Sequence, residues 1–174
     1  VFMPRVVVSV PCQMTEVQRR SVVDSISATG VRKICLIEEP IAAAMGAGVN
    51  IAEPHGCLVV DIGGGTTDMA VISLSGIAIS KTIPISGDVF DDAIIKYVRF
   101  KYNLLIGKRM AEEAKMAVGS GYPRTELIKH RIKGRNVITG LPQYADITSD
   151  EMLECLLEPA MKITQEIQRV LQST

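Results

Sequence analysis

A glycine-rich segment with an acidic residue at each end is the strongest candidate for chemistry in this sequence. It reads Asp61-Ile62-Gly63-Gly64-Gly65-Thr66-Thr67-Asp68. Consecutive glycines allow positive φ angles and the close approach of a ligand, and successive backbone N–H groups can then form an anion-binding nest. Thr66 and Thr67 add hydroxyl donors, and Asp61 could hold a hydrated Mg²⁺ against bound phosphates. The segment predicts phosphate binding, and the alternative is an ordinary glycine-rich hairpin turn capped by Asp.

Glu39 is the second candidate, because it ends one predicted strand and opens a predicted helix. From that position its carboxylate could orient a water for attack on a phosphoryl group. The alternative is that the acidic pair 38–39 only favours a helix N-terminus electrostatically. Glu112 and Lys115 have the spacing of a surface salt pair on a helix, and Asp88 is expected to cap the helix that begins near it.

These residues lie on elements of an α/β fold. The apolar run 5–10 has no alternation, which predicts a strand covered on both faces and an α/β sheet. Capping boxes and apolar stripes predict helices between the strands. The predicted strands are 5–10, 34–37, 57–62, 69–74 and 77–85, and the predicted helices begin near 15, 40, 88, 108 and 148. Residues 126–147 are more polar and strand-like, with Gly134-Arg135-Asn136 as a turn signal. Pro159 should kink or divide the last helix.

Composition narrows the class of protein. The 174 residues are 47% hydrophobic, so the chain can bury a core. Because 19 basic residues balance 19 acidic ones, the chain lacks the basic surface that binding of nucleic acid requires. No apolar run approaches the roughly 20 residues of a membrane-spanning helix. A zinc site is not expected, because the four cysteines lack C-x-x-C spacing and the two histidines are far apart in the sequence. Scattered cysteines also fit a reducing cytosol better than a set of disulfides. The start has neither an initiator Met nor a signal pattern, so we expect part of a longer protein.

Several segments taken in order resemble the actin-like ATPase superfamily: E-E-P-I-A-A-A, V-V-D-I-G-G-G-T-T-D, S-G-D-V-F-D-D-A-I and E-E-A-K. Within it, G-R-N-V-I-T-G-L-P and T-S-D-E-M-L-E-C-L-L-E-P resemble the MreB type of bacterial rod-shape-determining protein. The resemblance runs from Pro4 to Leu171 and implies an α/β actin-like ATPase (ribonuclease H-like) fold, present in part. The implied parts are the end of the first-lobe core subdomain (1–52), the second-lobe core subdomain (53–88 and 149–174) and an accessory subdomain of the second lobe (89–148).

The resemblance also implies ATP and Mg²⁺ as ligands and assigns residues to them. Asp61 matches the carboxylate that organises magnesium through water, and Glu39 matches the residue that positions the hydrolytic water. The remaining matches are the second phosphate loop (Gly63, Gly64, Gly65, Thr66 and Thr67), the nucleotide approach at Gly87, and the ribose and adenine contacts (Glu112, Glu113, Ala114 and Lys115). One departure is Ser86, where family members commonly have glycine.

By resemblance, the full-length protein would be an ATP-hydrolysing filament protein that associates with itself and with the cell-wall elongation machinery. It would lie in the cytoplasm in peripheral contact with the membrane and maintain rod shape. The family's first phosphate loop and adenine-embracing loop are not in this sequence, so we expect the chain by itself to bind ATP weakly and not to turn it over. The alternatives are the ATPase half of a heat-shock chaperone and a small-molecule kinase.

Overall fold

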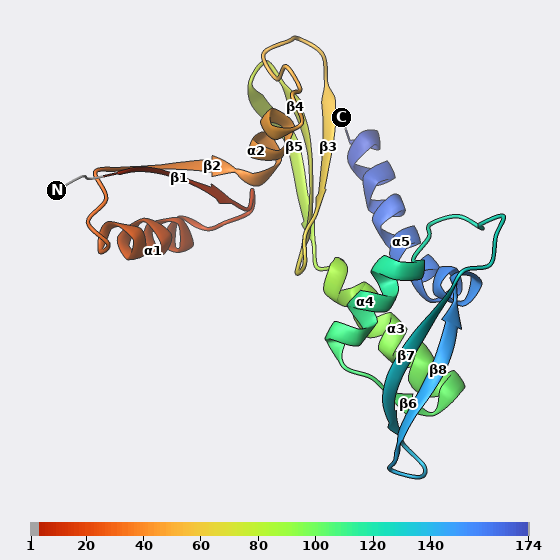
Figure 1. Ribbon diagram of the computed structural model, residues 1–174. Coiled ribbons are helices and arrows are strands. Elements are labelled where there is room, and N and C mark those ends of the chain that lie inside the picture. The colour runs from red at the N-terminus through yellow and green to blue at the C-terminus, as the bar shows by residue number, and fades with distance from the viewer. Residues whose placement is uncertain (1–3, 174) are drawn as a thin grey trace. The chain divides into compact units, whose positions relative to one another are not determined.

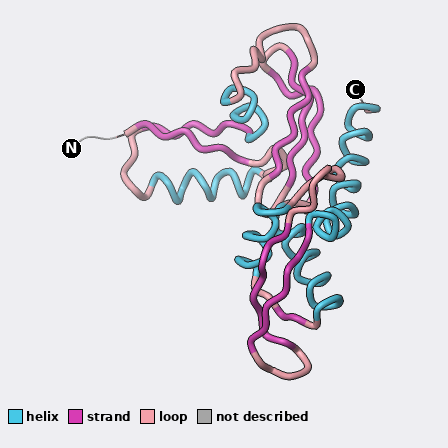
Figure 2. The backbone as a smooth tube through the Cα atoms, turned by 45° about the vertical axis from the view of Figure 1, so that its right-hand side comes forward, coloured by secondary structure: helices cyan, strands magenta, loops and turns pink. Residues whose placement is uncertain are grey.

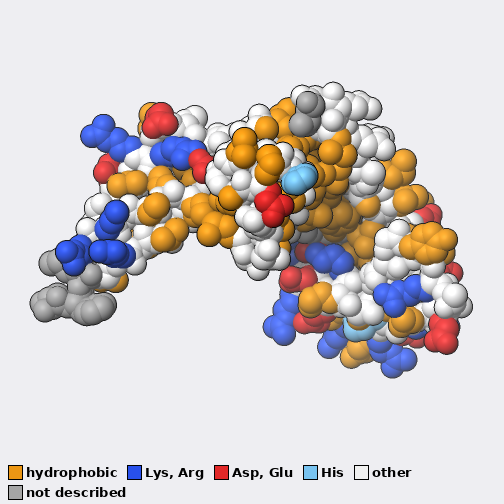
Figure 3. Space-filling model, turned by 90° about the horizontal axis from the view of Figure 1, so that it is seen from above, with side chains coloured by type: hydrophobic (Ala, Val, Ile, Leu, Met, Phe, Trp, Pro, Cys, Tyr) orange, Lys and Arg blue, Asp and Glu red, His pale blue; other side chains and the backbone are white. Residues whose placement is uncertain are grey.

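The computed structural model describes residues 4–173 and divides the chain into two compact units. The first unit comprises Val1–Pro84 and Ile167–Thr174, and the second comprises Ile85–Glu166. Acidic and basic side chains both appear on the face drawn in Figure 3, as expected for a chain with no net charge. The finer division into three subdomains stays a prediction.

The first unit begins with two parallel strands joined by a helix (Figure 1). The elements are β1 (Arg5–Val10), α1 (Glu16–Ser27), β2 (Lys33–Glu38) and α2 (Glu39–Gly46). The predicted capping box at the start of α1 is confirmed. The Thr15 N–H donates to Gln18 Oε1 at 2.9 Å, and the Gln18 N–H donates to Thr15 Oγ1 at 3.3 Å. Because β2 ends at Glu38 and α2 begins at Glu39, the chain changes from strand to helix at the candidate residue.

Three antiparallel strands complete the described sheets of the first unit (Figure 2). They are β3 (Cys57–Ile62), β4 (Thr67–Ser73) and β5 (Gly76–Ile83), with β4 in the centre. Six successive residues of β4, 67–72, are buried. Coverage on both faces was predicted for 5–10, and there the prediction is wrong, because exposed residues alternate along β1 and Val7 is 67% exposed. Ala44 of α2 packs in one core cluster with Ala70 and Ile72 of β4. This packing places α2 beside the strands that flank the glycine-rich turn.

The second unit packs helices against a small antiparallel sheet. Its elements are α3 (Gly87–Tyr102), β6 (Leu104–Leu105), α4 (Lys108–Val118), β7 (Lys129–Asn136), β8 (Pro142–Thr148) and the first part of α5 (Ser149–Gln172). One core joins all six elements and includes Ile94, Leu104, Ala114, Ile132, Ile147 and Met152. The predicted helix at 108–118 and the capping box that precedes α5 are confirmed.

Two local predictions in the second unit are wrong, and a third is wrong in one of its two alternatives. Gly134 lies inside β7, and the chain turns at 137–141 instead, where Gly140 has a φ of 73°. A side chain at Gly134 would collide with the backbone of Leu105, so this glycine serves a close approach rather than a turn. Helix α5 continues through Pro159, so the helix is not divided, whereas the alternative of a kink there stays a prediction. Asp88 lies in the first turn of α3, whose N-cap is Ser86, and its carboxylate pairs with Lys108 at 3.2 Å.

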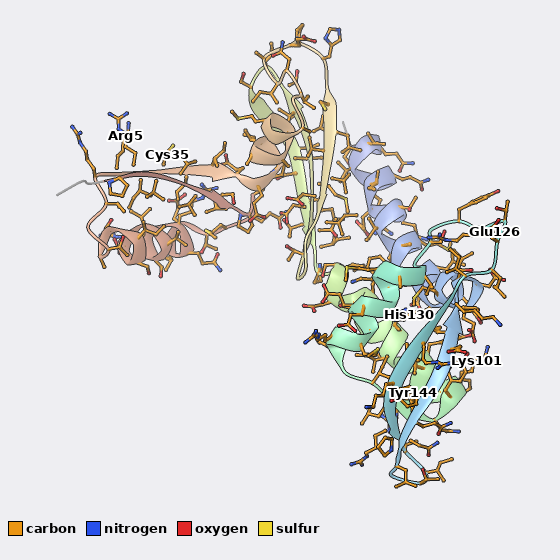
Figure 4. All side chains as sticks on the ribbon, viewed as in Figure 1. Arg5, Cys35, Lys101, Glu126, His130 and Tyr144 are labelled. Carbon is orange, nitrogen blue, oxygen red and sulfur yellow. The ribbon has the colours of Figure 1, made fainter. Side chains whose placement is uncertain are left out.

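A charged network ties the end of α3 to the start of α5. The Glu151 Oε1 atom lies 2.6 Å from Lys101 Nζ and accepts the Tyr102 hydroxyl at 2.6 Å, and the Thr148 N–H donates to Oε2 at 2.7 Å. Lys101 is labelled in Figure 4. Burial by itself would raise the pKa of Glu151, but the hydrogen bonds from Lys101, Tyr102 and Thr148 outweigh it and lower the pKa to about 2. The ionised form of Glu151 is therefore favoured by folding.

We expect Glu151→Gln to lower the free energy of unfolding of the second unit by about 2–3 kcal/mol at pH 7. The folded-state pKa is depressed, so this stability is present above the ordinary pKa of 4.5 and is lost as the pH falls toward 2. The difference between the two proteins in urea denaturation should therefore shrink between pH 5 and pH 2. Glu126→Gln, at an exposed position in the loop between α4 and β7, is the control and should change stability little. An equal loss of stability at pH 2 and pH 7 would contradict this account.

Candidate functional site

A pocket of about 280 Å³ opens beside the glycine-rich turn in the first unit. Its lining consists of acidic, glycine and threonine residues: Glu39, Asp61, Gly63, Gly64, Gly65, Thr66 and Asp68. Three elements supply the acids, since Glu39 opens α2, Asp61 is the penultimate residue of β3 and Asp68 is the second residue of β4. The structure thus brings Glu39 to the same pocket as Asp61 and the glycine loop, although Glu39 precedes Asp61 by 22 positions in the sequence.

The turn between β3 and β4 is closed by a hydrogen bond from the Gly63 N–H to the Thr66 carbonyl oxygen, at 2.9 Å. None of Gly63, Gly64 and Gly65 has a φ in the left-handed region, so the expected positive φ angles are not found. A Cβ atom at Gly64 or Gly65 would meet no atom within 4 Å. The protein itself therefore does not require glycine at these two positions, and the open space above them suits the close approach of a ligand.

The electrostatics of the pocket are dominated by carboxylates. Burial raises the pKa of Glu39, and the negative charges of Asp68 and Asp61 raise it further. A raised pKa makes this carboxylate a better proton acceptor, which suits a residue that orients or deprotonates water. The side chains that line the pocket offer oxygen atoms only, and oxygen is the ligand that Mg²⁺ prefers, often through water. The donor set therefore fits a hydrated magnesium ion beside Asp61.

Two threonines of the loop have different environments. Thr66 is exposed and lines the pocket, and its hydroxyl donates to Asp68 Oδ2 at 3.2 Å. Thr67 is fully buried in β4 and does not line the pocket, so its contact with a ligand stays a prediction. Thr67 begins the run of six successive buried residues of β4.

Asp68 is the last residue of the candidate glycine-rich segment, and we assigned it no role in ligand binding from the sequence. It is only 3% exposed, and its two oxygens accept hydrogen bonds from Thr66 and, at 2.6 Å, from Thr82 of β5. One feature of the sequence could have indicated Asp68: it is a carboxylate next to an apolar run, and a buried carboxylate needs hydrogen-bond partners. Those partners come from a neighbouring strand, so the sequence alone did not reveal them.

In the second unit, the structure brings Lys115 to the first turn of α3. The Lys115 ammonium lies 2.8 Å from Asp91 Oδ1 and donates to the Gly87 carbonyl oxygen at 3.3 Å. Lys115 therefore pairs with Asp91 rather than with Glu112, which corrects the expected surface pair. Asp91 is 6% exposed and was also missed, although it shares a helical face with the buried Ile94 and Val98. The ion pair fixes α4 to the segment that contains Gly87.

The other predicted residues of α4 differ in exposure. Glu112 is exposed, and Glu113 is partly buried and pairs with Arg109 at 2.9 Å. The side chain of Ala114 is completely buried in the core of the unit, so only its backbone remains for contact with a ligand. The assignment of Glu112, Glu113, Ala114 and Lys115 to ribose and adenine stays a prediction.

Two kinds of feature are absent from residues 4–173. No group of three or more His, Cys, Asp or Glu side chains in this part of the chain is arranged so that it could hold a metal ion. No helix there combines the length and the apolar character needed to cross a membrane.

The sequence is similar to curated proteins that determine cell shape. It is 48% identical to the cell shape-determining protein MreB of Escherichia coli (strain K12), over 94% of this chain and 47% of that protein. It is 40% identical to the cell shape-determining protein Mbl of Bacillus subtilis (strain 168), over 98% of this chain and 51% of that protein. The chain thus spans about half the length of the curated relatives it matches.

Solved structures give the same result. MreB5 of Spiroplasma citri bound to AMPPNP superposes with a TM-score of 0.93, over 97% of this chain and 50% of that chain. MreB5 bound to ADP superposes with a TM-score of 0.95, over 98% of this chain and 52% of that chain. Both are 39% identical in sequence to this chain. The MamK double helical filament, at 19% identity, matches with a TM-score of 0.76 over 98% of this chain and 50% of that one, and shows the fold alone. The fold is therefore that of the actin-like ATPases, present in part, as the resemblance predicted. The family model for MreB/Mbl protein matches residues 1–174, and the chain belongs to the MreB/Mbl family.

Proposed function

We propose that this chain is part of an ATP-binding and ATP-hydrolysing cytoskeletal protein that forms filaments and maintains rod cell shape. The observation that carries the proposal is the pocket in which Glu39, Asp61 and the open glycine loop come together. A relative with 39% identity binds AMPPNP and ADP, which supports a nucleotide as the ligand. Relatives with 40–48% identity are named as cell shape-determining proteins, which supports the cellular role.

Each lining residue has a role in this proposal. The backbone N–H groups of the loop 63–65 bind phosphate, and Asp61 holds the magnesium ion through water. Magnesium, when bound, neutralises charge on the phosphates. Glu39 orients the attacking water and accepts its proton. In the second unit, Lys115 and Glu112 contact the nucleoside, and the Lys115–Asp91 pair holds the Gly87 segment in place.

Self-association is the second part of the proposal. MamK, which shares the fold, is a double helical filament. Exposed apolar side chains at the tip of the β7–β8 hairpin would suit contact with another subunit: Val137 is 43% exposed, Ile138 76% and Leu141 66%.

Contact with the wall-elongation machinery, a cytoplasmic location and peripheral membrane association complete the proposal by family membership. Because phosphoryl transfer requires charge stabilisation from several sides, this chain by itself should bind ATP weakly.

Electron microscopy of the full-length protein tests the proposal, with magnesium and with or without ATP. ATP-dependent polymer is the expected result. Monomers under every condition would overturn the filament proposal and favour a chaperone-type ATPase or a small-molecule kinase. Assays of peptide release and of phosphate transfer to a small acceptor would then separate those two.

Gly65→Val should weaken nucleotide binding by the full-length protein without lowering its stability. The new side chain meets nothing in the protein within 4 Å of Cβ, so it occupies only the space assigned to phosphate. Gly46→Ala is a matched control, because Gly46 also has open space around it but does not line the pocket. Calorimetric titration with AMPPNP should show at least about a tenfold loss of affinity for the first variant only. Unchanged affinity for Gly65→Val would rule out the loop as the phosphate site.

A further inference from the structure

The exposed face of the β7–β8 hairpin gathers four basic side chains in one row. Exposed positions alternate with less exposed ones along β7, and four of the exposed positions are basic: Lys129, Arg131, Lys133 and Arg135. Alternate residues of a strand lie on the same face, and six residue steps spread this row over roughly 20 Å. The opposite face packs into the core of the unit, where Ile132 and Ile147 meet residues of α3, α4 and α5. The basic row therefore points away from the helices.

Little negative charge faces the row from the neighbouring strands. Of the four residues of β8 directly opposite it, only Asp146 is acidic, and it pairs with Arg131 at 3.2 Å. The Lys133 ammonium lies 5.6 Å from the ring centroid of Tyr144, which is labelled in Figure 4. Lys129 and Arg135, at the two ends of the row, have no ion-pair partner within residues 4–173.

The row creates a separation of charge that the composition does not reveal. The unit Ile85–Glu166 contains 12 basic and 12 acidic residues, so it has no net charge. The exposed face of the hairpin, however, holds the four basic residues and only one acidic residue, Asp146. The rest of the unit therefore carries the compensating negative charge. Such a separation turns the positive face toward an anionic surface.

The dimensions and chemistry of this face suit an anionic lipid bilayer. Its two unpartnered cations lie at opposite ends of the row, so one small anion cannot reach both, whereas a bilayer presents headgroups across the whole face. Lysine and arginine have apolar stems that can lie along a bilayer surface while their charged ends contact the headgroups. Tyr144 is 59% exposed on the same face, and exposed tyrosines are typical of the membrane interface.

We propose that the exposed face of the β7–β8 hairpin contacts the anionic headgroups of a lipid bilayer, chiefly through Lys129, Lys133 and Arg135. This inference rests on the proposed function, which includes peripheral membrane association but assigns no surface of this chain to it. The contact is electrostatic and does not require the apolar turn 137–141, which remains available to another subunit.

Cosedimentation of the full-length protein with vesicles tests the inference. The vesicles contain either phosphatidylcholine alone or equal parts of phosphatidylcholine and phosphatidylglycerol. We expect the triple variant Lys129→Gln, Lys133→Gln, Arg135→Gln to partition about a hundredfold less to the anionic vesicles at low salt, about fivefold for each cation. Its binding to the neutral vesicles should not change, and added salt should reduce the preference of the wild type for anionic lipid.

The matched control removes the same charge from the helices. Lys96→Gln, Arg99→Gln, Lys162→Gln changes exposed positions of α3 and α5 and should bind the anionic vesicles within a few-fold of the wild type. Arg131 is kept in both variants, so its pair with Asp146 stays intact. All substituted positions are exposed, so both variants should fold.

Four outcomes would overturn the inference. They are unchanged binding of the hairpin variant to anionic vesicles, an equal loss for the control variant, tighter binding of the wild type to a single-stranded oligonucleotide than to the anionic vesicles, and loss of ATP-dependent polymer by the hairpin variant without lipid. The last would assign the face to a second subunit. If the wild type polymerises with ATP but binds no anionic vesicles, this inference fails and the filament proposal stands. If it also fails to polymerise, the proposed function fails as well.

Discussion

Replacing Glu39 by glutamine should slow ATP hydrolysis by the full-length protein about 100- to 1000-fold while ATP binding changes little. The physical reason is the raised pKa of Glu39, which burial and the charges of Asp68 and Asp61 produce and which makes this carboxylate a better proton acceptor. Glutamine keeps the shape at the start of α2 but cannot accept a proton. The loss should therefore appear in the rate of turnover and not in affinity.

Single-turnover phosphate release and AMPPNP titration measure the two effects separately. Glu38→Gln is a matched control, because Glu38 is the adjacent acid but pairs with Arg19 at 3.3 Å and does not line the pocket. Its hydrolysis rate should stay within a few-fold of the wild type. If Glu39→Gln hydrolysed ATP as fast as the wild type, another group would have to orient the water.

The same variant links the site to assembly. If hydrolysis determines how long a filament lasts, Glu39→Gln should still polymerise with ATP and its filaments should persist longer than those of the wild type. Faster disassembly of Glu39→Gln filaments would instead separate filament lifetime from ATP hydrolysis. The link between hydrolysis and filament lifetime separates two kinds of protein. A filament scaffold needs ATP hydrolysis so that its filaments can be taken apart and rebuilt, whereas an enzyme that converts a metabolite does not need to form filaments.

Local sequence signals were sufficient for most elements of the fold. The capping boxes at Thr15 and Thr148 mark the starts of α1 and α5, because their hydrogen bonds join residues three positions apart. The turn signal at Gly134 failed for the opposite reason, since what requires glycine there is the backbone of Leu105 from another strand. Pro159 did not divide α5, although a proline inside a helix removes a backbone hydrogen bond.

The candidate site was predictable in part. Glu39, Asp61 and the glycine loop were identified from residue type and from their places at the ends of elements, and the structure gathers them in one pocket. Asp68 and Asp91 were missed because their importance depends on partners from other elements, Thr82 and Lys115. Sequence patterns report on residues a few positions apart, whereas these contacts join residues 14 and 24 positions apart.

Gly134→Ala should destabilise the second unit by about 3 kcal/mol, enough to lower its melting temperature by roughly 10 °C or more. The Cβ atom would collide with the Leu105 carbonyl oxygen and would lie 2.9 Å from Leu104 Cγ and 3.0 Å from Ile106 Cγ2. Leu104 and Ile106 are 0% and 5% exposed, and the carbonyl belongs to the backbone of β6, so none of the three groups can move aside cheaply. The strain should therefore separate β6 from β7 or displace both from the core.

Thermal unfolding of the chain followed by circular dichroism would measure this effect. Gly121→Ala is the matched control, because Gly121 lies in the same unit with open space around its Cα and without a left-handed φ. The control should melt within about 2 °C of the wild type, as surface substitutions usually do. An unchanged melting temperature for Gly134→Ala would mean that β6 can shift away from β7 without cost. In that case the glycine would not be what holds these two strands in close contact.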